Sequence, residues 1–127
     1  MPKYAHHDDA GFDLFAIEDT VIKIGDRVPV KTGIAMEIPS GHVGLIWDKS
    51  GLSVKEGIKT IAGVVDATYR GEILVAVTNI GKKDYKFEKG HKVAQMIIQR
   101  KETVEFEEVL ELSETKRGEG RLGSTGK

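Results

Sequence analysis

An acid and an aromatic side chain stand close together where an apolar run gives way to a polar turn. Within Gly63–Ile73, Asp66 directly follows Val64 and Val65, and Tyr69 comes three residues later. Partial burial beside the valines would raise the pKa of the carboxyl toward the range that suits a general base. The pattern predicts a catalytic acid at the mouth of a hairpin, with a flat platform for a ligand beside it. The alternative is a turn in which Asp66 bonds its own backbone.

A second candidate site lies at Lys49, Ser50 and Gly51. An ammonium, a hydroxyl and exposed backbone N–H groups at the start of a helical turn suit a bound anion. Gly51–Gly57 is the range that suggests such a turn, and it is too short for a stable helix on its own. The alternative is that Ser50 simply caps the turn.

Two single polar residues interrupt apolar runs and are further candidates. Asp13 follows Phe12, and Gln95 precedes Met96. For Asp13 the commoner case is a solvent-facing residue on a half-buried strand. For Gln95 it is a satisfied amide on an edge strand.

The end of the chain has a different composition from the rest. Residues 113–127 contain Leu122 as their single large apolar side chain, and several glycines loosen the backbone. We therefore predict a β domain over 1–112 and a flexible arm over 113–127. The arm is either a frayed terminus or a segment that orders over a ligand. Gly123–Lys127 contains residue types that commonly bind phosphate, but it lacks the glycine spacing and the following helix of a P-loop.

The elements that must position these residues are short strands. Apolar runs separated by glycine-containing turns predict an all-β sandwich or barrel. Several runs alternate, so successive side chains face opposite sides. The predicted strands are Phe12–Ile17, Val21–Ile24, Val28–Val30, Ile34–Ile38, Val43–Trp47, Ile73–Thr78 and Val93–Ile98, with a further alternation at Lys86–Glu88.

Composition narrows the class of protein. The 127 residues suit one domain, and 39% hydrophobic with 31% charged residues is typical of a soluble globular protein. No apolar run is long enough to span a membrane, and no signal peptide is visible. A net charge of −1 does not favour nucleic-acid binding. The absence of cysteine excludes disulfides and fits a cytoplasmic location.

The candidate residues occur in an order that resembles a known family. Ala-Gly-Phe-Asp-Leu, Lys-Ser-Gly-Leu, Gly-Val-Val-Asp with Tyr-Arg-Gly, Lys-Gly-His-Lys-Val-Ala-Gln-Met-Ile, and Arg-Gly-Glu-Gly with Gly-Ser-Thr-Gly follow one another. These are similar to the five sequence motifs of the trimeric dUTPases, and the resemblance covers essentially the whole chain.

The resemblance implies a fold, an assembly and a reaction. The fold would be a dUTPase-like β jelly roll, assembled as a homotrimer whose active sites are shared by three subunits. The enzyme would be a dUTP diphosphatase that hydrolyses dUTP to dUMP and pyrophosphate, supplying dUMP and keeping uracil out of DNA. Asp66 would activate the water that attacks the α-phosphorus. Mg²⁺ would bridge the triphosphate, with Asp13 as an outer-shell partner through water.

The resemblance also implies substrate contacts. Tyr69 would pack against the deoxyribose and reject a 2′-hydroxyl. Uracil would insert into a hairpin around Thr60–Val65, whose backbone groups would imitate a pairing base. The implied substrate-binding residues are Lys49, Ser50, Gly51, Thr60, Gly63, Val65, Tyr69, Gln95, Arg117, Leu122, Gly123, Ser124 and Thr125.

Four positions depart from the family pattern. Lys49 stands where arginine is usual, so the charge remains but the planar, two-pronged grip on phosphate is lost. Leu122 replaces the aromatic residue that stacks on uracil, which predicts weaker closure of the arm. Arg121 replaces a glycine beside it, and Thr60 stands where many relatives have asparagine.

Two alternative functions are a dCTP deaminase and a non-catalytic binding protein. The dCTP deaminases resemble dUTPases but place a catalytic glutamate on the strand after the third motif, where this chain has Ala76. A non-catalytic trimer that binds nucleotide or a protein partner would bind without turnover, and Asp66→Asn would then change nothing measurable.

Overall fold

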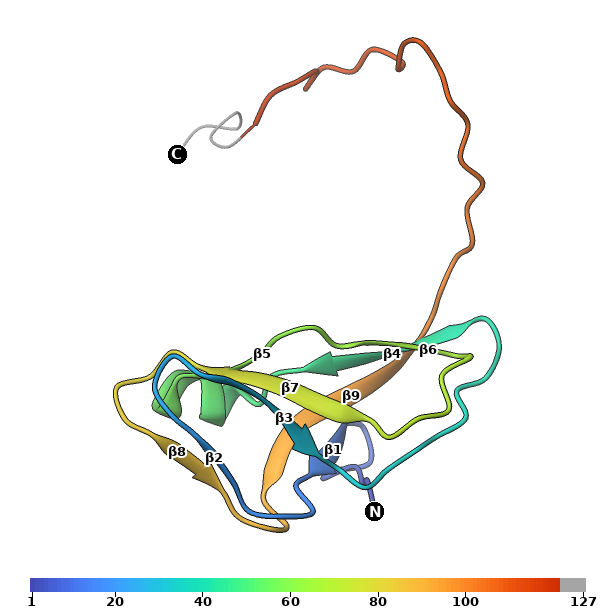
Figure 1. Ribbon diagram of the computed structural model, residues 1–127. Coiled ribbons are helices and arrows are strands. Elements are labelled where there is room, and N and C mark those ends of the chain that lie inside the picture. The colour runs from blue at the N-terminus through green and yellow to red at the C-terminus, as the bar shows by residue number, and fades with distance from the viewer. Residues whose placement is uncertain (122–127) are drawn as a thin grey trace.

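The computed structural model describes residues 1–121, and strands make up nearly all of their regular structure. Within these residues, no helix is long and apolar enough to cross a bilayer. Three antiparallel sheets surround one core (Figure 1). The strand order of the four-stranded sheet is β1 (Phe12–Phe15), β9 (Lys92–Arg100), β4 (His42–Trp47) and β6 (Val64–Asp66). The order of the three-stranded sheet is β3 (Arg27–Lys31), β7 (Leu74–Asn79) and β5 (Ile58–Thr60). The third sheet consists of β2 (Thr20–Ile22) paired with β8 (Tyr85–Phe87). The predicted all-β fold is confirmed.

The core forms from the alternation that the sequence shows. In β7, Val75 and Val77 are buried, whereas Ala76 between them and Thr78 after them point toward the opposite side and are less buried. Side chains from the other sheets meet them. The largest fully buried apolar residues include Leu14, Phe87 and Met96. Apolar burial of this kind is the main stabilising contribution to the fold.

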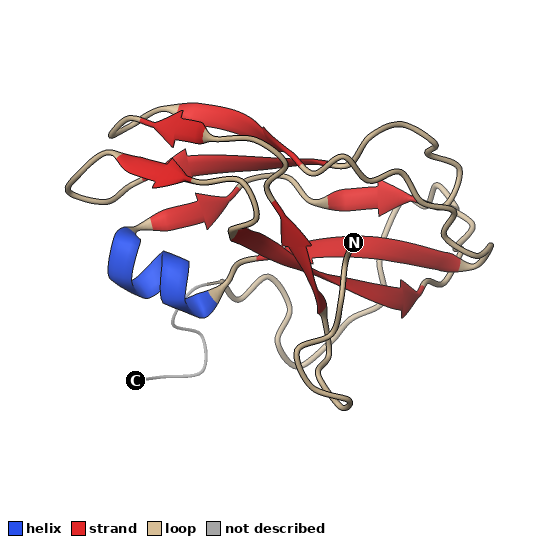
Figure 2. Cartoon of the chain, turned by 90° about the horizontal axis from the view of Figure 1, so that it is seen from below, coloured by secondary structure: helices blue, strands red, loops and turns tan. Residues whose placement is uncertain are grey.

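A single short helix, η1 (Leu52–Glu56), lies at one end of the strands in the described chain (Figure 2). It is wound as a π-helix and ends at Gly57, which has a left-handed φ of +71°. Glycine adopts this conformation without strain from a Cβ. The predicted helical turn over Gly51–Gly57 is thus confirmed. No side-chain hydrogen bond caps its start, so the alternative role of Ser50 as a cap is wrong.

The strand predicted over Ile34–Ile38 is wrong. Its side chains do alternate, since Ile38 is buried while Ala35 and Glu37 are exposed. The backbone is extended, but it joins no sheet ladder among the described residues. One of its few backbone contacts is the bond from Ile73 N–H to the Ile34 carbonyl, at 2.7 Å. Alternation reports an extended backbone with one buried side, and it does not require a paired strand.

The hairpin predicted around Thr60–Val65 differs from the structure in its pairing. β5 pairs with β7 in one sheet, whereas β6 pairs with β4 in another. Thr60–Val65, which we call the bridging segment, therefore connects two sheets and closes no ladder of its own. Ile61 N–H donates to the Ala76 carbonyl at 2.9 Å, and Ile46 N–H donates to the Gly63 carbonyl at 2.8 Å. The segment is thus tied to both sheets.

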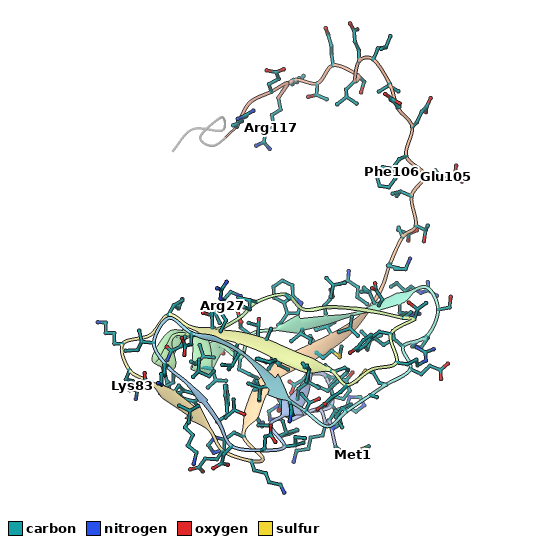
Figure 3. The ribbon with its side chains drawn as sticks, viewed as in Figure 1. Met1, Arg27, Lys83, Glu105, Phe106 and Arg117 are labelled. Atoms are coloured by element: carbon teal, nitrogen blue, oxygen red, sulfur yellow. The ribbon has the colours of Figure 1, made fainter. Side chains whose placement is uncertain are left out.

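The last strand ends well before the predicted arm. β9 stops at Arg100, and the chain then runs away from the body of the protein as an extended segment (Figure 3). Side chains along it, such as Phe106, are almost fully exposed. The sequence places the boundary at Leu112 because residues 101–112 still include apolar side chains.

Asn79 gives a test of what holds the strands together. Its buried amide donates to the carbonyls of Ile22 and Lys83, at 3.1 and 2.9 Å, and its oxygen accepts from Gly81 N–H at 2.9 Å. Asn79→Ala leaves these groups without partners and is expected to lower the free energy of unfolding by about 2–4 kcal/mol. Urea denaturation measures the loss. Thr78→Ala removes one exposed hydrogen bond and serves as the control; equal losses in the two variants would contradict the prediction.

Candidate functional site

A cavity of about 250 Å³ gathers the residues predicted around the reacting acid. Its lining includes Gly63, Val65, Asp66 and Tyr69, all of which the sequence singles out. The bridging segment forms one wall, and the turn after β6 forms another. The structure therefore brings these four predicted site residues together. Thr60 lines a second hollow, of about 280 Å³, on another side of the segment.

Asp66 lies at the end of β6, where it pairs with Val43 of β4. Its side chain is exposed on the single chain, so the partial burial predicted from the valines is wrong. Val64 also points outward and is 71% exposed, which explains the difference. With the described residues, the carboxylate forms no ion pair and no hydrogen bond, so the alternative in which it bonds its own backbone is wrong as well. Such an acid at a cavity mouth is available to a water or a ligand.

The ring of Tyr69 is fixed in place beside Asp66. Its hydroxyl donates to the Glu72 carbonyl at 2.9 Å, and its backbone N–H donates to the Asp66 carbonyl at 3.0 Å. A Cβ at Gly71 would overlap the hydroxyl of Tyr69, so the Tyr-Arg-Gly sequence is needed for this ring position. Tyr69 also lines the cavity, as predicted for a platform.

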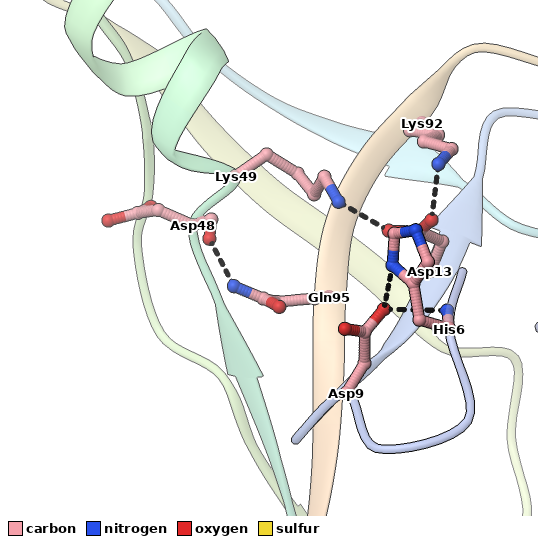
Figure 4. A network of polar contacts seen from close by, with 7 residues as sticks. All are labelled: His6, Asp9, Asp13, Asp48, Lys49, Lys92 and Gln95. Carbon is pink, nitrogen blue, oxygen red and sulfur yellow. Dashed lines mark hydrogen bonds and ion pairs between the residues drawn. The ribbon is translucent and has the colours of Figure 1, made fainter. Parts of the chain in front are cut away.

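A second group forms around Asp13, which is only 2% exposed. Lys49 Nζ donates to Oδ1 at 2.6 Å, and Lys92 Nζ lies 2.7 Å from Oδ2 (Figure 4). Burial raises the pKa of Asp13, but the hydrogen bonds and charges of the two lysines outweigh it, and the pKa is lowered below its usual value. The alternative of a solvent-facing Asp13 is therefore wrong.

Gln95 lies next to Asp13 across the β1–β9 ladder. Its amide nitrogen donates to the Asp48 backbone carbonyl at 2.9 Å (Figure 4), which leaves the amide oxygen for another partner. β9 is flanked by β1 and β4, so Gln95 does not lie on an edge strand. An adjacent hollow of about 490 Å³ is lined by Lys49, Gly51 and Lys92 among others. Its two ammonium groups suit an anionic ligand.

The two groups lie at opposite ends of β4. Asp66 is opposite Val43 and Gln95 is opposite Trp47. Four residues of strand separate these positions by about 13 Å. The acid beside the cavity and the cationic hollow are thus two surfaces on one chain, and the structure does not bring their residues together.

Three residues at the site have no signal in the sequence. Lys92 is the second partner of Asp13, and Asp48 contacts Thr60 and Lys59. Ala62 has a φ of +62° and is the one residue other than glycine with positive φ in the described chain. Such strain is often found at functional sites. An exposed lysine or aspartate is common in any sequence, and alanine gives no hint of a left-handed backbone.

The arm residues are only partly described. Arg117 lies on the extended segment, away from both groups (Figure 3), and its side chain donates to the Gly120 carbonyl at 3.1 Å. Leu122, Gly123, Ser124 and Thr125 lie outside the described residues.

Comparisons with known proteins identify the class. The dUTPase family model matches residues 1–126. The deoxyuridine 5'-triphosphate nucleotidohydrolase of Clostridium tetani is 46% identical over 129 residues, covering 100% of this chain and 89% of that protein. The corresponding protein of Corynebacterium glutamicum is 48% identical over 130 residues, covering 100% and 87%. The chain belongs to the dUTPase family, as the motif order predicts.

Solved structures agree with this assignment. The dUTPase of Staphylococcus bacteriophage 80alpha with dUPNHPP is 30% identical and superposes with a TM-score of 0.93, covering 99% of this chain and 91% of that one. A mutant dUTPase from phage phi11 of S. aureus, described with a structural Mg(II) ion, is 28% identical with a TM-score of 0.81, covering 87% and 90%. The β-strand architecture predicted from the family resemblance is confirmed.

The Asp13 cluster predicts how stability depends on pH. Because the pKa of Asp13 is lowered in the folded state, its ionised form stabilises the fold above its unfolded pKa, and this contribution is lost as the pH falls through the folded pKa. The free energy of unfolding should therefore drop below about pH 4. Asp13→Asn should flatten this drop in urea titrations. Asp8→Asn, whose side chain is 97% exposed, should keep it; an unchanged acid slope in Asp13→Asn would contradict the assignment.

Proposed function

We propose that this chain hydrolyses dUTP to dUMP and pyrophosphate, in keeping with its curated relatives, which are named as nucleotidohydrolases of deoxyuridine 5'-triphosphate. The observation that carries the proposal is the Asp66 carboxylate, unpartnered among the described residues, beside the fixed ring of Tyr69 in a cavity walled by backbone of the bridging segment. The function supplies dUMP and removes a uracil nucleotide before it enters DNA. We place it in the cytoplasm, with no nucleic-acid or membrane partner.

Asp66 orients a water molecule and accepts its proton as the oxygen attacks the α-phosphorus. Its exposure on the single chain leaves room for that water, and the substrate itself supplies the burial that the chain lacks. Tyr69 packs against the deoxyribose, because its hydroxyl is tied to the Glu72 carbonyl and its ring cannot swing away. A 2′-hydroxyl would meet the ring, which excludes ribonucleotides by contact.

The base is read by backbone groups of the bridging segment, with Gly63 and Val65 lining the cavity. Gly63 has a φ of +144°, and a Cβ there would lie 2.7 Å from the Ile46 carbonyl oxygen. A side chain would therefore push the segment off β4. The Thr60 hydroxyl is already bonded to Asp48, so Thr60 contributes mainly through the position of its backbone.

The phosphates are met by the cationic hollow. Lys49 supplies charge, Ser50 and Gly51 supply a hydroxyl and backbone N–H groups, and the free oxygen of Gln95 accepts hydrogen bonds from ordered water. Arg117 and the residues that follow it complete the contacts from the arm. As the bond to the α-phosphorus breaks, negative charge develops on the pyrophosphate leaving group. A fixed positive surface stabilises this charge and so favours the reaction.

The residues present suit Mg²⁺ held mostly by the substrate. No three His, Cys, Asp or Glu side chains gather to form a metal site within residues 1–121. Asp13 Oδ2 has no well-directed hydrogen bond, so it has the capacity to accept one, and because it is buried beside Lys92 a metal-bound water would reach it only where the Lys92 ammonium gives way. This donor set fits an ion that keeps its waters and binds phosphate oxygens. Bound Mg²⁺ supplies charge neutralisation along the triphosphate.

The separation of the two groups along β4 supports a shared active site. A phosphate held at the cationic hollow lies about 13 Å along the strand from a water held by Asp66 of the same chain. If a second copy places its cationic hollow next to the cavity beside Asp66, the phosphate and the attacking water can come into contact. We therefore propose a homotrimer in which different subunits contribute Asp66, the phosphate contacts and the arm.

Turnover tests the proposed reaction directly. Purified protein with Mg²⁺ should release pyrophosphate from dUTP in preference to UTP, dTTP and dCTP. Asp66→Asn should lower kcat by about 10²–10⁴-fold with little effect on nucleotide binding, because the general base is lost. Release of ammonia from dCTP would indicate a deaminase. Nucleotide binding without turnover, unaffected by Asp66→Asn, would indicate a binding protein.

Mixing two inactive variants tests the shared site. Asp66→Asn and Gln95→Ala homotrimers should each have little activity. Random mixed trimers, formed by refolding equal amounts together, should regain activity in about one quarter of their sites, because each intact site takes Asp66 from one copy and Gln95 from another. Mixtures without any recovery would show that both residues act within a single chain.

A further inference from the structure

Asp48 accepts two hydrogen bonds from the start of the bridging segment and a third from the residue before it. It follows β4 directly, and its Oδ1 accepts from both the backbone N–H and the hydroxyl of Thr60, at 2.6 and 2.7 Å. Its Oδ2 accepts from Lys59 Nζ at 2.5 Å. The side chain is 23% exposed. Hydrogen bonds to an ionised carboxylate are shorter and stronger than those between neutral groups.

The ionised form of Asp48 is the one that makes these contacts. Burial raises its pKa, but the hydrogen bonds from Lys59 and Thr60 and the charge of Lys59 outweigh it, so the pKa is lowered below its ordinary value. The carboxylate therefore keeps its charge at neutral pH, and the contacts with Thr60 persist there.

The bridging segment needs such a contact because its backbone is strained. After Thr60 the chain leaves the β5–β7 ladder, passes through Ala62 at a φ of +62° and Gly63 at +144°, and joins β4. A left-handed alanine persists where the surrounding structure holds it. The bond from Ile46 to Gly63 fixes the far end of this turn, and Asp48 fixes the near end.

The backbone of Asp48 makes a separate contact with the other group. Its carbonyl accepts from the Gln95 amide at 2.9 Å (Figure 4). A side-chain substitution at Asp48 removes the Thr60 contacts and leaves this carbonyl in place. The two roles of the residue can therefore be separated by mutation.

We propose that Asp48 is a positioning residue for base selectivity: its carboxylate holds Thr60, and so keeps the bridging segment in the conformation that distinguishes uracil from other bases. The proposal rests on the proposed dUTP hydrolysis. Sugar selectivity has a different origin, because Tyr69 is held by the Glu72 carbonyl rather than by Asp48. Base and sugar discrimination should thus respond differently to a change at position 48.

Steady-state kinetics with four nucleotides test the proposal. Asp48→Ala should lower kcat/KM for dUTP by about 10–100-fold, mainly through KM, because the base reader is displaced while Asp66 is not. The preferences for dUTP over dTTP and over dCTP should fall. The preference for dUTP over UTP should stay close to that of the wild type.

Two further variants locate the effect. Thr60→Val removes the hydroxyl contact and keeps the backbone one, so it should shift the base preference in the same direction by less. The Asp48→Ala, Thr60→Val double variant should be no worse than Asp48→Ala alone, because the hydroxyl contact that Thr60→Val removes is already lost in Asp48→Ala. Additive losses would show that the residues act independently and would overturn the proposal.

Asp84→Ala is the matched control. Asp84 accepts a hydrogen bond from the Ile24 backbone N–H at 3.0 Å and fixes a turn beside β2. Its loss should lower thermal stability without altering any substrate preference. If Asp48→Ala likewise leaves the dUTP to dTTP ratio unchanged, Asp48 is a purely structural residue and the proposal is wrong.

Amide hydrogen exchange separates this inference from the proposed function. If the wild type does not hydrolyse dUTP, the proposed function fails. The effect of the Asp48 carboxylate on the bridging segment can still be measured as exchange rates at the Thr60 and Ile61 amides. Faster exchange there in Asp48→Ala than in Asp84→Ala supports the inferred role of Asp48 in holding Thr60, and equal exchange overturns it. Asp48→Leu, which is close to aspartate in shape and accepts no hydrogen bond, replaces Asp48→Ala if the alanine variant does not fold.

Discussion

The pairing of β4 on both of its edges sets the geometry of the whole site. β9 pairs with one edge and β6 with the other, so a single strand fixes where Gln95 and Asp66 lie. Their opposite partners are Trp47 and Val43, which places the proposed phosphate contacts at one end of the strand and the proposed reacting acid at the other. A strand is stiff, and it cannot fold to bring its ends together. Assembly with other copies is the direct way to join the two halves, and this is the physical reason for the trimeric site proposed above.

The acids of the site divide into two kinds by their partners. Asp13 and Asp48 each have several cationic or hydrogen-bonding partners, and both have lowered pKa values because of them. Carboxylates held in this way are poor proton acceptors, and they serve to position other groups. Asp66 has no such partner among the described residues and is exposed, so in the proposed reaction its carboxylate is open to water and substrate. The positioning acids are thus complete in the single chain, whereas the reacting acid is not.

The sequence predicts those parts of the structure that depend on local patterns. Strands such as β7 follow from alternation, and Asp66 and Tyr69 lie together because three residues of turn cannot separate them far. Motif order identifies Asp13 and Gln95, although a polar residue within an apolar run looks the same whether it is exposed or buried. The role of Asp48 was missed because its contacts with Thr60 and Gln95 join residues far apart in the chain. The pairing of β5 and β6 in different sheets was missed for the same reason, since turn residues predict a reversal but not the partner of each arm.

Lys49 has a single charged nitrogen, and this nitrogen must contact both Asp13 and any phosphate that Lys49 binds. Its ammonium lies 2.6 Å from Asp13, so any phosphate that it contacts must approach within reach of that same nitrogen. A guanidinium could bond a carboxylate with one edge and a phosphate with another. In this chain the two contacts share one atom, so a phosphate close to Lys49 is also brought close to the buried carboxylate. Lys92 reduces the resulting repulsion, because it provides Asp13 with a second cation, 2.7 Å from Oδ2.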